Sequence, residues 1–400
     1  MSVYVHIPFC DYRCRYCNFV FETGWSPALL QKTLDAIALE AARELQRCTR
    51  EGLQPRFHTL YLGGGTPGII PPDKIGPFFS QLNHALGVSG SGKGVGWEGV
   101  GWQEVGFEVN PENVTTELLV ALASSGVNRL SVGLQSFSTE RLQLLGRWCT
   151  RETNLRALEL ICGHWKGSWS ADLMTGLPGE PGGQGQTWKE LKTDLETLLA
   201  FEPPHVSLYS LIVEPETALH SLLQGGKLTA ASAPVQDQLW LSAKAHLQKK
   251  GYEWYEISNF ARPGQRSLHN PVYWRMDPWM GLGPGAEGNL VAKNDKGGYS
   301  PLRTRNARLF PWLTGGENAR TEELLTAPEY LLEHFLTGWR TSDGLSATRL
   351  AQVFHNLPAH LELCLTDDQR LALNRHLEAL PDFEAAELRP NWLVALQDLS

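Results

Sequence analysis

The chain has 400 residues, of which 42% are hydrophobic and 20% are charged, and its formal net charge is −8. This length predicts two domains, or one large barrel with an appendage, with ample apolar side chains for a core. The acidic balance excludes a global positive field, so nucleic acid is not an expected partner. We find no charged leader and no apolar run of about 20 residues, the length that a membrane helix needs. We therefore expect a protein of the reducing cytoplasm, without membrane insertion.

Short apolar runs alternate with amphipathic segments through the first half of the chain. Strands are expected at residues 3–7, 59–62, 105–109, 129–134, 171–174 and 206–211, and helices at 27–47, 115–124 and 187–200. Such alternation predicts a parallel α/β sheet. About six units over residues 1–215 favour an incomplete barrel of the (β/α)6 type over a full barrel of eight units.

The remainder of the chain is less regular. Residues 87–102 are rich in Gly and Ser and are interpreted as a surface insertion. The polar stretch 294–318 is interpreted as a linker, and helices are expected beyond it at 327–337, 347–354 and 367–379. We therefore expect a core domain over residues 1–300 and a smaller, mainly helical carboxy-terminal domain over residues 301–400.

Three cysteines lie within eight residues, directly after the first predicted strand: Cys10, Cys14 and Cys17. Thiolates are the usual ligands of a 4Fe–4S cluster. Three of them leave one iron open for a small molecule with a free amine and carboxylate, such as the methionine part of S-adenosylmethionine (SAM). Zinc usually takes four ligands in paired Cys-x-x-Cys arrangements, and an odd number of thiols fits poorly with disulfides. The spacing therefore favours an iron–sulfur cluster.

Further candidate residues fall at the carboxyl ends of the predicted strands, where the active sites of parallel barrels gather. The run 63–67 (Gly-Gly-Gly-Thr-Pro) follows the second strand, and successive glycines let the backbone approach a ligand closely. Glu108 and Gln135 end the third and fourth strands, and Asp172 lies within the fifth. Arg147 could bind a carboxylate. Each residue alone is more often a structural or surface residue, but together they predict one site.

The chain resembles the radical SAM superfamily in the three-cysteine motif and in the run 63–67. Within that superfamily it is similar to the branch around oxygen-independent coproporphyrinogen III oxidase. Further matches, in the same order, are residues 108–111 (Glu-Val-Asn-Pro), 131–137, 172–179, 255–261 and 269–274 (His-Asn-Pro-Val-Tyr-Trp). The resemblance covers about residues 2–290. It implies a radical SAM barrel with a 4Fe–4S cluster on the three cysteines.

Two features make the chain resemble heme chaperones of the HemW type rather than the oxidase itself. The oxidase usually has a further cysteine two residues after the third cluster ligand, where this chain has Phe19, and a longer segment before the first strand. The resemblance implies heme binding and heme transfer to acceptor hemoproteins. The alternative is SAM-dependent oxidative decarboxylation of coproporphyrinogen III. A third interpretation keeps SAM binding without SAM cleavage, with a cluster that serves assembly or dimerisation.

The resemblance also implies which residues bind the ligands. The expected contacts of SAM are Tyr4, Gly64, Gly65, Thr66, Glu108, Gln135, Arg147 and Asp172. His269 is the expected ligand of heme iron, and Asn270, Tyr273 and Trp274 are expected beside the porphyrin. For an unplaced histidine among aromatic residues, a purely structural role in the core is the common alternative. The expected partners are heme and acceptor hemoproteins, with membrane-bound acceptors and a homodimer left open.

Overall fold

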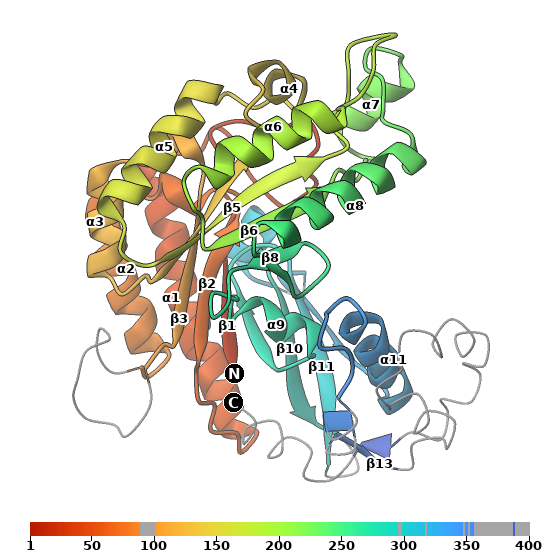
Figure 1. Cartoon of the computed structure of the whole chain (residues 1–400). Coiled ribbons are helices and arrows are strands. Elements are labelled where there is room, and N and C mark those ends of the chain that lie inside the picture. Colours follow the sequence, from red (N-terminus) through yellow and green to blue (C-terminus); the bar gives the residue numbers. More distant parts are fainter. Residues whose placement is uncertain are drawn as a thin grey trace.

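The structure, a computed structural model (Figure 1), describes residues 1–88, 101–294, 298–316, 318–346, 349–350, 353–355 and 387–388. Most of the predicted insertion at 87–102 lies outside these residues. Much of the predicted helix at 347–354 and all of the one at 367–379 also lie outside them.

Six strands form a parallel sheet in chain order, each one paired with the next. They are β1 (Ser2–Ile7), β2 (Thr59–Gly64), β3 (Glu104–Val109), β4 (Arg129–Gln135), β5 (Ser168–Thr175) and β6 (His205–Ser210). These strands confirm the six predicted apolar runs. Because the carboxyl ends of parallel strands meet at one edge, residues that follow β1 to β6 are brought together there.

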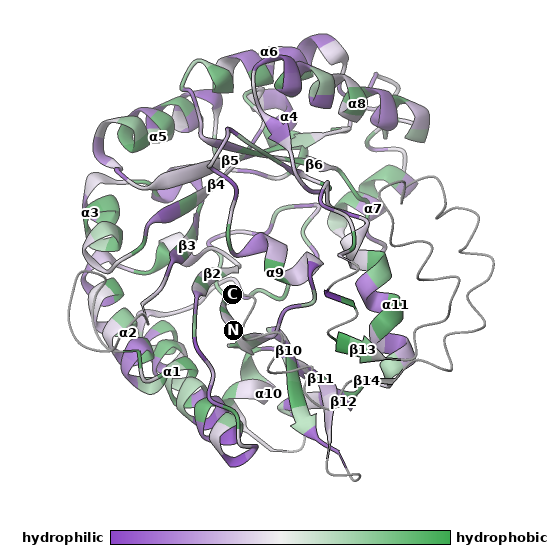
Figure 2. Ribbon diagram, turned by 60° about the horizontal axis from the view of Figure 1, so that its bottom comes forward, coloured by the Kyte–Doolittle hydropathy of each residue, from purple (hydrophilic) through white to green (hydrophobic). Residues whose placement is uncertain are grey.

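An outer layer of helices covers the strands, and Figure 2 shows it as a ring around the sheet. It comprises α1 (Pro27–Arg50), α2 (Pro72–Ala85), α3 (Thr116–Ser124), α5 (Arg151–His164), α6 (Trp188–Leu199) and α8 (Ala233–Lys249). Shorter helices are α4 (Thr139–Leu144), α7 (Ala218–Gln224), α9 (Asn270–Trp274) and α10 (Leu309–Thr314), and α11 (Ala327–Gly338) follows. Within the described ranges, no helix is long and apolar enough to cross a membrane.

Helix α1 illustrates why the outer helices form and pack as they do. Ser26 caps its first turn by accepting a hydrogen bond from the backbone N–H of Leu29, and Pro27 occupies the first helical position. Leu30 and Leu34 lie on one stripe at helical spacing and are buried against the sheet. The amphipathic pattern therefore determines which face of the helix meets the strands.

The sheet continues on both sides of the six parallel strands. Its order is β12-β11-β10-β9-β1-β2-β3-β4-β5-β6-β8-β7, and among the described residues it does not close on itself. The added strands are β7 (Glu253–Trp254), β8 (Asn259–Ala261), β9 (Trp279–Leu282), β10 (Glu287–Lys293), β11 (Tyr299–Asn306) and β12 (Arg320–Leu324), and β13 (Phe354–His355) pairs separately with β14 (Glu387–Leu388). This open sheet with helices outside confirms the incomplete barrel.

The interpretation of residues 294–318 as a linker is wrong, because β11 and α10 lie within them. Strand β11 pairs antiparallel with β10 on one side and β12 on the other. Its alternation buries Leu302 and Thr304 while Arg303 and Arg305 pair with acidic side chains. A half-buried strand of this kind looks polar in sequence. The strand also runs across residue 300, where the sequence predicts the boundary between two domains. The division of the chain into two domains remains a prediction.

The inner face of the barrel is polar because side chains alternate along each strand. In β1, Val3, Val5 and Ile7 are fully buried in the apolar core, whereas Tyr4 and His6 contact each other through their rings. The same alternation in the other strands places polar side chains inside, from the amino end to the carboxyl end. They include Thr59, Tyr61, Glu104, Glu108, Arg129, Ser131, Ser170, Asp172, His205 and Ser207, most of which line an internal cavity. The interior is therefore equipped to bind polar groups.

Candidate functional site

The loop after β1 brings the three predicted cluster ligands to one cavity. Cys10, Cys14 and Cys17 all line a cavity of about 390 Å³ at the carboxyl end of the strands. Backbone hydrogen bonds fix this loop: Arg15 N–H donates to Leu145 O (2.8 Å), and Arg15 O accepts from Leu219 N–H (2.7 Å). The three thiols are free and partly exposed. The three thiols of one contiguous motif thus line the same cavity.

Among the described residues, no group of three or more His, Cys, Asp or Glu side chains is arranged to hold a single metal ion. The preference for a cluster over a zinc ion rests on the spacing of the three cysteines in the sequence.

Two donors point at the sulfur atoms. The Thr66 hydroxyl lies 3.5 Å from Cys10 Sγ, and the Arg147 guanidinium lies 3.9 Å from Cys14 Sγ. Burial raises the pKa of Cys10 to about 12 and that of Cys17 to about 11. Burial also raises the pKa of Cys14, although the Arg147 guanidinium opposes this shift. Hydrogen-bond donors at these positions stabilise thiolates once a metal displaces their protons.

The glycine run has a structural reason of its own. Gly64 has a φ of +108°, and a Cβ at this position would lie 2.6 Å from the His6 ring. A Cβ on Gly65 would lie 2.6 Å from Phe9 O. Close packing against β1 and the residues after it therefore already requires these two glycines, independently of any ligand. Both glycines also line the cysteine cavity, as predicted.

Two carboxylates from β3 and β5, the strands on either side of β4, lie deep in the same cavity. Glu108 in β3 accepts hydrogen bonds from the Tyr61 hydroxyl (2.9 Å) and from Gly64 N–H (3.3 Å). Asp172 in β5 accepts from the Ser131 hydroxyl (3.1 Å). Burial and the nearby Asp172 charge raise the pKa of Glu108 to about 7. Burial also raises the pKa of Asp172 to about 6, against the effect of its hydroxyl donors.

Arg147 and Gln135 complete the cavity wall. The Arg147 side chain is buried and donates to Gly133 O (2.7 Å) and to Asn110 Oδ1 (3.2 Å). Gln135, the last residue of β4, has a φ of +66°, in the left-handed region that non-glycine residues rarely adopt. Such backbone strain clusters at binding and active sites. Gln135 and Arg147 both line the cavity, as the sequence predicted.

Tyr4 is the one predicted SAM contact that does not line the cysteine cavity. It lines a second, internal cavity of about 220 Å³, where Glu108 and Tyr209 are also found. The Tyr4 hydroxyl lies 3.0 Å from His6 Nδ1, and its ring stacks on Tyr61. Glu108 and Tyr209 line both cavities, so they separate the cysteine cavity from the interior.

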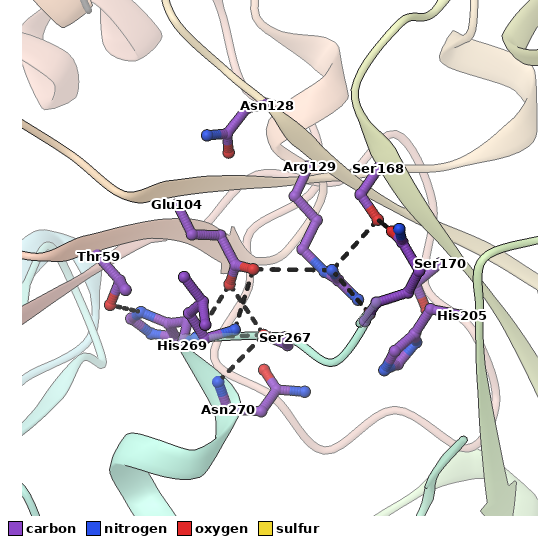
Figure 3. Close-up of polar contacts among 12 residues, drawn as sticks. Thr59, Glu104, Asn128, Arg129, Ser168, Ser170, His205, Ser267, His269 and Asn270 are labelled. Carbon is purple, nitrogen blue, oxygen red and sulfur yellow. Dashed lines mark hydrogen bonds and ion pairs between the residues drawn. The ribbon is translucent and has the colours of Figure 1, made fainter. Parts of the chain in front are cut away.

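The predicted heme residues are His269, which precedes α9, and three residues of α9, at the opposite end of the barrel; Figure 3 shows His269 and Asn270. His269 is fully buried and contacts Thr59, the first residue of β2. The last residue of β2, Gly64, lines the cysteine cavity, so the two sites lie at opposite ends of this strand. His269 Nδ1 lies 2.7 Å from Thr59 Oγ1, and Nε2 lies 2.8 Å from the Tyr273 hydroxyl. Burial lowers the pKa of His269 to about 3. Both ring nitrogens are therefore occupied in this conformation.

A buried ion pair holds this histidine segment across the barrel. Glu104 and Arg129, near the amino ends of β3 and β4, lie 3.7 Å apart (Figure 3). The Glu104 carboxylate also accepts from the Ser267 hydroxyl (2.9 Å), Leu268 N–H (3.0 Å) and His269 N–H (2.9 Å). Figure 2 shows α9 inside the ring of outer helices. The segment around His269 thus closes the amino end of the barrel, and Asn270 lines the internal cavity.

Comparisons with known proteins agree with this geometry. Residues 4–190 match the radical SAM superfamily. The chain is 31% identical over 369 residues to the heme chaperone HemW of Synechocystis sp., covering 91% of this chain and 84% of that protein. It is 32% identical over 351 residues to the mitochondrial radical S-adenosyl methionine domain-containing protein 1 of Bos taurus, covering 86% and 74%. The chain belongs to the radical SAM superfamily, in the same family as the HemW proteins.

The solved structure of coproporphyrinogen III oxidase (HemN) from Escherichia coli, a radical SAM enzyme, supports the fold assignment. Its TM-score with this radical SAM protein is 0.68, and the match covers 100% of this chain and 88% of that one. The identity is 19%, so this likeness shows the fold and nothing finer.

The residues of the cavity fit the cofactors that the superfamily implies, a 4Fe–4S cluster and SAM. The cluster would lie on Cys10, Cys14 and Cys17, where it supplies a one-electron reductant and one open iron. Glu108 and Asp172 would face the cationic SAM, and Thr66 and Arg147 already donate toward the thiols. The chain thus provides cluster ligands, donors to their sulfur atoms and acidic groups in one cavity.

The raised pKa of Glu108 predicts a pH-dependent affinity for SAM. Since this pKa is about 7, the carboxyl is largely neutral at pH 6 and largely ionised at pH 8. SAM carries a sulfonium cation, which an ionised carboxylate attracts. We expect the affinity of the anaerobic, cluster-loaded protein for SAM to rise severalfold over this interval, toward the limit of about tenfold that one pKa unit of coupling sets. Calorimetric titration at several pH values measures it.

A matched pair of variants tests the source of this pH dependence. Glu108→Gln removes one of the two titrating carboxyls of the cavity, the other being Asp172, and should make the profile shallower. Glu214→Gln removes a carboxylate that lines the same cavity and should leave the profile intact. Equal slopes for the wild type and Glu108→Gln would contradict the assignment.

Several cavity residues were not among the predicted contacts. Tyr12, Asn110, Ser131 and Tyr209 all line the cysteine cavity. Tyr209 could have been found from strand alternation, because it follows His205 and Ser207 on the inner face of β6. Asn110 lies in the motif 108–111, which was identified without assigning this residue a role. Tyr12 lies between two cluster ligands, and its hydroxyl donates to Glu112 (2.6 Å).

Proposed function

We propose that the protein is a heme chaperone that keeps a 4Fe–4S cluster and a SAM site, binds heme and transfers it to acceptor hemoproteins. The observation that carries this proposal is the similarity to HemW heme chaperones over most of both chains, about 30% identity with the proteins of Synechocystis sp. and Bacillus subtilis. We propose that the protein works in the cytoplasm. Membrane-bound hemoproteins are candidate acceptors, and a homodimer is a candidate assembly.

Exposed apolar residues at the mouth of the cysteine cavity support the binding of a large apolar ligand. Phe19 stands where the oxidase usually has a further cysteine, and its side chain is 66% exposed at the cavity lining. Ile212 lines the same mouth and is 68% exposed. Exposed apolar side chains that gather at a cavity mark a binding surface. This mouth is therefore a candidate surface for a flat apolar ring, separate from the His269 motif at the opposite end of the barrel.

His269 remains our predicted ligand of heme iron, with Asn270, Tyr273 and Trp274 beside it. Neutral imidazole is a common heme ligand, and burial holds His269 neutral. For ligation, Nε2 has to exchange the Tyr273 hydroxyl for iron, and Nδ1 has to release Thr59 when the segment moves. Heme binding through this motif therefore requires the segment 267–274 to move away from the barrel end.

Anaerobic heme titration of the cluster-reconstituted protein, followed by absorbance, tests the function. We expect saturable binding near one heme per chain, and transfer to an apo-hemoprotein added afterwards. His269→Ala should remove the spectrum of an imidazole-ligated heme, whereas His164→Ala, a change at an exposed position on α5, should leave it intact. The absence of heme binding by the wild type would overturn the proposal.

The alternative function is the oxidative decarboxylation of coproporphyrinogen III, which the sequence resemblance to the oxidase branch implies. Its assay is product formation with SAM and a reductant under anaerobic conditions. Product without saturable heme binding would make the oxidase the better assignment. SAM binding without release of 5′-deoxyadenosine would instead support a cluster with an assembly role.

A further inference from the structure

Asn110 lies between the two donors that reach the predicted cluster ligands. Its Nδ2 is 3.2 Å from Thr66 Oγ1, and its Oδ1 is 3.2 Å from the Arg147 guanidinium. Thr66 in turn faces Cys10 Sγ at 3.5 Å, and Arg147 faces Cys14 Sγ at 3.9 Å. One side chain thus connects the donors of two thiols that are separated by three residues in the chain.

The side chain of Asn110 is available for this network because it caps nothing locally. Asn110 precedes η2 (Pro111–Asn113), and its side chain accepts no hydrogen bond from that turn. Both ends of the amide are therefore directed at the cysteine cavity, which Asn110 lines.

The chemistry of the partners determines the direction of every hydrogen bond in this network. A guanidinium can only donate, so the amide oxygen of Asn110 must face Arg147. The amide nitrogen then faces Thr66 and donates to its hydroxyl oxygen. Since that oxygen already accepts from Asn110, the single hydroxyl proton of Thr66 is free for the sulfur of Cys10.

We infer that Asn110 is a positioning residue for the cluster. It directs the hydroxyl proton of Thr66 to Cys10 and holds the guanidinium of Arg147 beside Cys14. The inference rests on the proposed cluster at the three cysteines. Hydrogen bonds to the sulfur atoms of a cluster raise its reduction potential, and residues that orient such donors affect metal sites strongly. Asn110 therefore helps to determine the potential at which the cluster accepts an electron.

The variant Asn110→Asp tests this role with almost no change in shape. A carboxylate only accepts, so the Thr66 hydroxyl turns toward Asp and no longer donates to Cys10. We expect a lower reduction potential of the reconstituted cluster, measured without SAM by a redox titration followed by electron paramagnetic resonance. Asn18→Asp adds the same charge to the lining of the same cavity at a residue outside the hydrogen bonds of Thr66 and Arg147, and it should lower the potential less.

Combining substitutions at positions 66 and 110 distinguishes an effect of hydroxyl orientation on the potential from an effect of the added charge. Thr66→Val removes the donor to Cys10, so it should lower the potential in the wild-type background. In the Asn110→Asp background the hydroxyl is already turned away, and Thr66→Val should cause little further change. Equal effects of Thr66→Val in both backgrounds would overturn the inference, as would equal shifts for Asn110→Asp and Asn18→Asp.

A second comparison applies if Asn110→Asp assembles little cluster. Thr66→Ser keeps the hydroxyl and should keep the wild-type potential together with the hyperfine coupling of one exchangeable proton near the cluster. Thr66→Val should lose both. The same potential and coupling in all three proteins would overturn the inference while leaving the cluster in place. A wild-type protein that assembles no cluster would instead overturn the cluster assignment, and the inference with it.

Discussion

Replacing Cys14 with serine is expected to abolish assembly of the cluster. Each of the three thiols in the cysteine cavity would bind a different iron atom, so no remaining residue of the motif can take over the role of Cys14. Iron and acid-labile sulfide per chain, measured after anaerobic reconstitution, should fall at least about tenfold. Even substitutions of residues that only orient the ligands of a metal site lower the metal affinity by about 10–100-fold.

A cysteine elsewhere provides the control for this result. Cys162 is exposed on α5, outside the cysteine cavity. Cys162→Ser should therefore take up the wild-type amounts of iron and sulfide. Full iron and sulfide in Cys14→Ser would refute the assignment of the ligands and would require another group to hold the cluster.

Removing the carboxylate of Glu104 should be the most destabilising single change at the other end of the barrel. Glu104 and Arg129 are each only 6% exposed, and Arg129 NH2 has no hydrogen-bond partner. Glu104→Ala leaves the buried guanidinium without its counter-charge, and it also removes the acceptor for Ser267, Leu268 and His269. We expect a loss of about 3–5 kcal/mol in the free energy of unfolding, measured by denaturant titration of the cluster-free protein.

The double variant Glu104→Ala, Arg129→Met supplies the comparison. Removing both charges of a buried ion pair is far less costly than removing one, so the double variant should recover much of the lost stability. A loss below about 1 kcal/mol for Glu104→Ala would show that water in the internal cavity solvates Arg129. The histidine segment would then be held mainly by its own packing.

The two ends of the barrel have separate tasks in this interpretation. The carboxyl end holds the cysteine cavity with its donors and carboxylates, and the amino end is closed by the segment that contains His269. Polar side chains fill the interior between them. Heme binding through His269 would therefore couple to the ion pair of Glu104 and Arg129, because that pair anchors the backbone of the same segment.

Sequence patterns predicted the parts of the fold that depend on local repeats. The six inner strands were apolar runs buried by the helices outside them, and α1 had its apolar stripe at helical spacing. Strand β11 was missed because it is half polar. It pairs with β10 and β12, the strands that precede and follow it in the chain, and its arginines form ion pairs with Glu287 and Glu333.

The sequence by itself predicted the three cysteines as one site, because all three lie in one short loop, and the structure places all three at one cavity. It also placed Glu108, Gln135 and Asp172 at one edge, because parallel strands align their carboxyl ends. Only the tertiary structure decided that Asn110 connects Thr66 to Arg147, and that His269 lies buried at the other end of the barrel. His269 meets Thr59 across 210 residues of chain. Contacts of that kind depend on how the strands close around the interior, which no local pattern of residues specifies.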